Sequence, residues 1–163
     1  PSYLVFALLT GGLVCLGIFT LLGHGTYPSI ASIATLALVA IVTAAIKIIY
    51  WRSIDRIELP SREAATALEG IGKVTVFERP HTEANYLTRE MGFVLARKHS
   101  RKLRIIAVAL FAVIPLLALL IAAQLPATAA FALWVAAISA LAGAFVERWL
   151  FFAEARHMVM LYY

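Results

Sequence analysis

The chain has a single cysteine, Cys15, and few charged residues, since only 14% of its 163 residues are Asp, Glu, Lys or Arg. One thiol cannot form a disulfide within the chain, ligate an iron–sulfur cluster or attach a c-type haem. We therefore expect Cys15 to act as a small apolar filler. Hydrophobic residues make up 63% of the sequence, well above the average for soluble domains. This composition excludes an ordinary soluble globular protein.

Four long apolar runs account for the composition, at residues 3–22, 29–50, 105–124 and 127–146. A helix needs roughly 20 residues, rising ~1.5 Å each, to cross a hydrocarbon layer ~30 Å thick. Because lipid offers no partner to an exposed backbone N–H or C=O, runs this continuous predict helices rather than barrel strands. The first run lacks the basic segment that precedes a signal peptide's apolar core. We predict a single all-α membrane domain, a multi-pass helical bundle with four spans.

The charges are concentrated in the central loop, residues 51–104. Eleven of the 14 Lys and Arg residues lie between Arg52 and Arg104, and the two short connections between spans carry none. This is the positive-inside pattern, and it predicts a cytoplasmic loop with both termini on the same side.

The central loop also has internal order. Pro60 and Ser61 predict the start of a short helix over residues 62–69, followed by an extended segment at 73–77. Thr82 can cap a second helix that continues into the third span. This helix carries an apolar stripe and ends in a basic run. The run either sits at the lipid headgroups and fixes topology, or docks a partner protein through Tyr86, Arg97, Lys98 and His99.

Small residues predict how the spans pack, because helices associate in lipid through close approach. In the fourth span Ala132, Ala136, Ala140 and Ala144 recur every four residues, with Ser139 and Gly143 beside them. The same spacing occurs in the first span at Ala7 and Gly11 and in the second at Ala40 and Ala44. Pro115 is expected to kink the third span.

The helical pattern of the fourth span continues beyond its apolar run, as a predicted extension over residues 147–163. It carries four candidate site residues: Glu147, Arg148, Glu154 and His157. At the membrane interface, which we favour, these charges would simply be solvated. Deeper in the bundle, a Glu–Arg pair would be costly and therefore functional.

Two stretches give a family resemblance. Residues 81–99 read HTEANYLTREMGFVLARKH and residues 147–157 read ERWLFFAEARH. Both closely resemble the membrane anchor subunit of the dimethyl sulfoxide reductase family, with similarity from about Tyr50 to the C-terminus. Family anchors have about twice as many spans, so the chain resembles their C-terminal half. The residues that shape the family's quinol pocket belong largely to the other half.

The resemblance implies a role in anaerobic respiration at the bacterial inner membrane. Such an anchor holds a molybdenum catalytic subunit and an iron–sulfur subunit, and it oxidises menaquinol or ubiquinol to supply them with electrons. Glu147, Arg148, Glu154 and His157 would then lie near the route of quinol or its protons. The family's partner subunits are periplasmic, which conflicts with the orientation that the charges predict, so orientation stays open.

The residues themselves do not favour a bound metal or haem. His24 lies on one side of the predicted membrane, and His81, His99 and His157 lie on the other, so two-histidine haem ligation is not expected. His81, Glu83 and His99 lack zinc-ligand spacing. Nor does the sequence show a nucleophile–base constellation or a phosphate-binding loop. The alternatives to a quinol-oxidising anchor are half of a secondary transporter and a structural membrane assembly protein.

Overall fold

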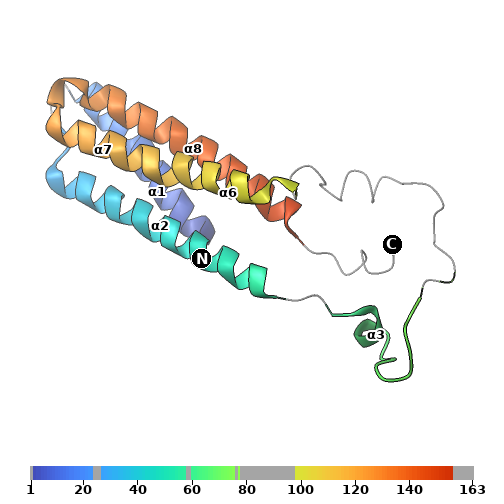
Figure 1. Cartoon of the computed structure of the whole chain (residues 1–163). Helices are drawn as coiled ribbons and strands as arrows, with labels where there is room; N and C mark the ends of the chain where they lie inside the picture. Colours follow the sequence, from blue (N-terminus) through green and yellow to red (C-terminus); the bar gives the residue numbers. More distant parts are fainter. Residues whose placement is uncertain (1, 24–26, 58–59, 76, 78–97, 156–163) are drawn as a thin grey trace.

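The computed structural model describes residues 2–23, 27–57, 60–75, 77 and 98–155. These residues form a bundle of helices and contain no β-strand. Figure 1 shows the long helices lying side by side, with the short helix α3 (Arg62–Ala65) beyond one end of the bundle. The predicted all-α fold is confirmed.

Four helical segments within the described residues are long and apolar enough to cross a membrane. They are α1 (Ser2–Leu22), α2 (Ile30–Arg56), the continuous segment Ser100–Gln124, and the segment Pro126–Ala153. The third comprises α6 (Ser100–Val108), the π-turn η1 (Ala109–Val113) and α7 (Ile114–Gln124). The fourth comprises the 3-10 turn η2 (Pro126–Thr128) and α8 (Ala129–Ala153). The chain is a multi-pass transmembrane bundle.

Several boundaries differ from the prediction. The second span continues as helix to Arg56, six residues past its apolar run. Helix α8 ends at Ala153, and residues 156–163 of the predicted extension lie outside the described part. His99 has non-helical backbone angles and is the N-cap of α6, so the third span begins at Ser100, and residues 83–97 of the helix predicted before it lie outside the described part. The short loop helix ends early because Ala67 adopts a left-handed backbone (φ 56°).

The packing face predicted on the fourth span is present. Ala136 and Ala140 are fully buried, and Ala132, Ser139 and Gly143 are nearly so. A methyl group on Gly143 would lie 2.6 Å from the backbone nitrogen of Phe111, so only glycine allows this approach. The small side chains of α8 therefore bring it against α1, α7 and η1.

On the second span Ala40 is buried and Ala44 packs against a buried cluster, as predicted. The pair predicted on the first span is wrong, because Ala7 and Gly11 are exposed. Helix α1 instead buries larger residues, with Leu9 and Leu13 in the main core and Phe6 edge-on to Phe111. A four-residue spacing defines a face but does not say which face meets the neighbouring helix. Cys15 is likewise exposed.

Pro115 changes the pattern of backbone hydrogen bonds in the third span. The N–H of Ile114 bonds to the carbonyl of Ala109, five residues back, in the π-turn. The next donor in that register would be Pro115, which has no N–H. The carbonyl of Leu110 instead accepts a hydrogen bond from the Ser139 hydroxyl at 2.7 Å.

Candidate functional site

A buried ion pair joins the second and fourth spans. Lys47 of α2 contacts Glu147 of α8, and their side chains are only 2% and 1% exposed. Glu147 follows directly on the small-residue face of α8, which brings this part of the helix close to its neighbours. Taking two charges out of water is expensive, so a pair retained at such a position is a functional candidate.

Arg148 adds a second cation to Glu147. Its Nε lies 2.8 Å from Glu147 Oε2, and its guanidinium carbon lies 3.6 Å from the centroid of the Tyr3 ring of α1. On the other side of the pair, Lys47 Nζ lies 4.2 Å from the Tyr50 ring centroid and 5.2 Å from that of Trp51. The carboxylate therefore sits between two cations, and aromatic faces cover those cations.

A second group of charges lies nearer the helix ends. Arg104 of α6 donates two hydrogen bonds to Asp55 of α2, at 2.7 and 2.9 Å, and one from Nε to Glu154 beside the end of α8, at 2.8 Å. This two-sided geometry suits the planar guanidinium fork. The Arg104 guanidinium carbon is also 5.5 Å from the ring centroid of Trp51. The same ring lies near Lys47, so Trp51 stands between the two groups of charges.

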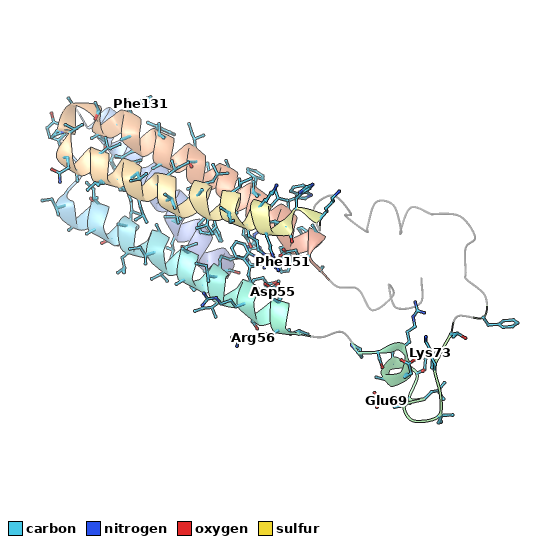
Figure 2. The ribbon with its side chains drawn as sticks, in the orientation of Figure 1. Asp55, Arg56, Glu69, Lys73, Phe131 and Phe151 are labelled. Atoms are coloured by element: carbon cyan, nitrogen blue, oxygen red, sulfur yellow. The ribbon has the colours of Figure 1, made fainter. Side chains whose placement is uncertain are left out.

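The two groups form what we call the charge ladder: Lys47, Asp55, Arg104, Glu147, Arg148 and Glu154. Lys47, Trp51 and Asp55 follow one another at four-residue intervals on α2, so they share one face of that helix. Eight residues of helix correspond to ~12 Å, which is the depth that the ladder covers. Its three cations and three carboxylates balance. In Figure 2 Asp55 and Phe151 lie at the end of the bundle from which the loops leave.

Not every polar atom of the ladder is satisfied. Both Glu147 oxygens lie at ion-pair distance from a cation, yet neither is in hydrogen-bond geometry. Glu154 Oε2 and Arg148 Nη1 are also buried without a hydrogen-bond partner. Buried polar atoms are normally hydrogen-bonded, so Glu154 Oε2 and Arg148 Nη1 are the exceptions in the ladder, whereas both Glu147 oxygens are held by ion pairs.

The structure therefore brings together three of the four residues predicted near the quinol or proton route. Glu147, Arg148 and Glu154 are all ladder members, and His157 lies outside the described residues. Glu147 is enclosed by helices, so its charge is not simply solvated. Of the docking residues, Tyr86 and Arg97 lie outside the described part, Lys98 is exposed and His99 is half-buried.

Sequence reasoning missed Lys47, Asp55 and Arg104 as site residues. The available signal was the spacing of Lys47, Trp51 and Asp55, which places a charge at each end of one helical stripe. In the described ranges, no three His, Cys, Asp or Glu residues are grouped closely enough to hold a metal ion.

Comparisons with protein-family models, curated proteins and solved structures found no match to this chain.

Proposed function

We propose that this chain is part of the membrane anchor of a dimethyl sulfoxide reductase-like molybdoenzyme complex in the bacterial inner membrane. In this role it helps to oxidise menaquinol or ubiquinol and to pass electrons to an iron–sulfur partner subunit. Two features support the proposal: the resemblance of residues 81–99 and 147–157, and the position of Glu147, Arg148 and Glu154 within the charge ladder.

The observation that carries the proposal is the enclosed carboxylate of Glu147. Oxidation of one quinol releases two electrons and two protons, and the protons cannot enter hydrocarbon without groups to receive them. Glu147, in contact with Lys47 and Arg148, offers a buried carboxylate, and Glu154 lies about two turns nearer the loop end. The ladder thus supplies ionisable groups from the interior to the end of the bundle.

The partner-docking part of the proposal assigns Tyr86, Arg97, Lys98 and His99 to binding of the iron–sulfur and molybdenum subunits. Affinity purification of the chain from its native membrane should recover both subunits. Charge reversal at Arg97 and Lys98 should release them while the anchor stays inserted, because charge complementarity guides such docking. Retention of both subunits by that variant would contradict the docking assignment.

Quinol-driven activity tests the role of the ladder. Glu147→Gln removes one charge at nearly constant volume, and it should slow quinol-driven reduction of the terminal substrate while activity with an artificial soluble donor is unchanged. Glu69→Gln is the matched control, since it makes the same chemical change at an exposed residue of the central loop. Equal quinol-driven rates in both variants, with normal assembly, would place the proton route elsewhere. His157→Ala tests the last residue of the predicted route in the same assay.

The Lys47–Glu147 pair also favours a second candidate, half of a secondary transporter. Transporters place ionisable residues between their spans at a central substrate site. A transporter reconstituted into vesicles would move an ion or solute in a manner that depends on Lys47, and it would not copurify with redox subunits. Copurification with the redox subunits, but no quinol-driven activity in the purified complex, would instead indicate a structural assembly protein.

A further inference from the structure

Two arginines near the end of α2 stand apart from the charge ladder. Arg52 and Arg56 are exposed and lie one helical turn apart, whereas Lys47 and Trp51 on the same helix are buried. Figure 2 shows Arg56 on the outer side of α2, away from Asp55. Within the described residues, neither arginine forms an ion pair, whereas Arg104 and Arg148 both pair with carboxylates. Their charge is therefore available to a group outside the bundle.

The two arginines line one hollow on the surface of the helix. Its volume is about 490 Å³, and its other lining residues are Ile49, Ser53 and Ile57. Ile49 is 66% exposed and Ile57 58% exposed, so apolar surface lies on either side of the two guanidinium groups. The hollow combines two free cations and a hydroxyl with an apolar wall, at the point where a membrane span ends.

This combination matches the chemistry of an anionic phospholipid. A guanidinium group binds phosphate oxygens through two parallel hydrogen bonds, and a serine hydroxyl can donate a third. Ile49 lies one turn deeper in the span than Ser53, where an acyl chain of the same lipid would run. A free phosphate ion would leave that apolar wall exposed. Basic residues at the end of a span are known to attract anionic lipids.

We propose that Arg52, Ser53 and Arg56 bind the phosphate of an anionic phospholipid whose acyl chain packs on Ile49. This site lies on the outer face of α2 and is separate from the charge ladder, so it does not depend on the proposed electron-transfer role.

The test uses the full chain in nanodiscs of phosphatidylcholine that contain a small share of spin-labelled phosphatidylglycerol. The measured quantity is the association of labelled phosphatidylglycerol with the protein relative to labelled phosphatidylcholine. We expect a clear preference for phosphatidylglycerol, which should fall by roughly fivefold for each of Arg52→Gln and Arg56→Gln. Ser53→Ala should reduce it less, because it removes one hydroxyl and no charge.

The matched control is the double variant Arg101→Gln and Lys102→Gln. These two exposed residues of α6 carry the same charge but do not line the hollow. Preserved preference in this control, together with its loss in the two α2 variants, supports the site. Equal losses in both would mean that net charge alone attracts the lipid, and no loss in the α2 variants would overturn the proposal.

One further outcome would also overturn it. Displacement of labelled phosphatidylglycerol by millimolar inorganic phosphate would show that the arginines bind a free anion. If one arginine variant fails to fold, the other arginine variant and Ser53→Ala give the same comparison.

Discussion

Lys47 and Glu147 form an ion pair between α2 and α8 with both side chains almost fully buried. Removing Glu147 leaves Lys47 buried and unpaired, which costs ~3–5 kcal/mol, whereas removing Lys47 should cost less because Arg148 still pairs with Glu147. We therefore expect Lys47→Met and Glu147→Gln each to lower the thermal stability of the purified chain in detergent. The double variant should lose much less than the sum of the two, because neither charge is then left alone. Strictly additive losses would show that the pair is not energetically coupled.

The close approach at Gly143 predicts a position-specific effect of one methyl group. Gly143→Ala would place a carbon 2.6 Å from the Phe111 nitrogen, forcing α8 away from η1 at a cost of ~1–3 kcal/mol. Gly11→Ala is the control, because that position on α1 has no atom within 4 Å. It should be neutral or stabilise the helix by up to ~1 kcal/mol. Equal unfolding temperatures for both variants in detergent would contradict the packing described here.

Leu110 and Ser139 allow a rescue experiment. Ser139→Ala should cost ~1–3 kcal/mol, because the Leu110 carbonyl loses its hydroxyl donor. Adding Pro115→Ala supplies a backbone N–H that can bond to the Leu110 carbonyl, five residues back. The double variant should therefore recover part of that loss. The measurement is again thermal unfolding in detergent. A double variant less stable than Ser139→Ala would show that Pro115 stabilises the span in another way.

Ala136 and Ala140 test the packing face as a whole. Both are fully buried on α8, so replacing either with Leu should push this helix away from its neighbours and destabilise the bundle by ~1–3 kcal/mol. Ala7→Leu makes the same change on an exposed position of α1 and should be tolerated. Unchanged stability in both α8 variants would remove the packing-face assignment.

The loop helix α3 gives a pH prediction. The pKa of Glu63 lies below its ordinary value because its own backbone N–H, and then that of Val74, donate hydrogen bonds to the carboxylate. Because the pKa of Glu63 is lower in the folded loop than in the unfolded chain, its ionised side chain stabilises the loop fully at any pH above the unfolded-state pKa. This contribution is lost as the pH falls through the folded-state pKa. The Val74 amide resonance should therefore shift with acid titration by NMR, below the pH at which an unfolded glutamate titrates. In Glu63→Gln the shift should be absent.

The sequence predicted the four spans well, because a continuous apolar run of about 20 residues has few other stable solutions in lipid. It was less informative at the helix ends. Helix α2 continues beyond its apolar run because Trp51 is buried in the bundle and Asp55 pairs with Arg104. These tertiary contacts stabilise the last turns of the helix. Composition alone does not reveal such pairing.

The site was predicted only on the helix that carries the resemblance. Glu147 and Glu154 were identified there, but their cations Lys47 and Arg104 come from other helices. Which residues meet depends on how far each span is shifted along its neighbour, and that shift is set by contacts such as Gly143 against Phe111. The relative shift of two helices cannot be deduced from the pattern of a single sequence.

The separation of Lys47 and Glu147 along the chain has a consequence for biosynthesis. Glu147 is made 100 residues after Lys47, which at ~5–20 residues per second is a delay of roughly 5–20 s. During that interval the ammonium group of Lys47 has no Glu147 carboxylate with which to pair. Its long side chain must then extend toward the nearer membrane surface. Helix α8 therefore supplies the carboxylate that neutralises Lys47, and a chain that stops before α8 leaves this charge without its partner.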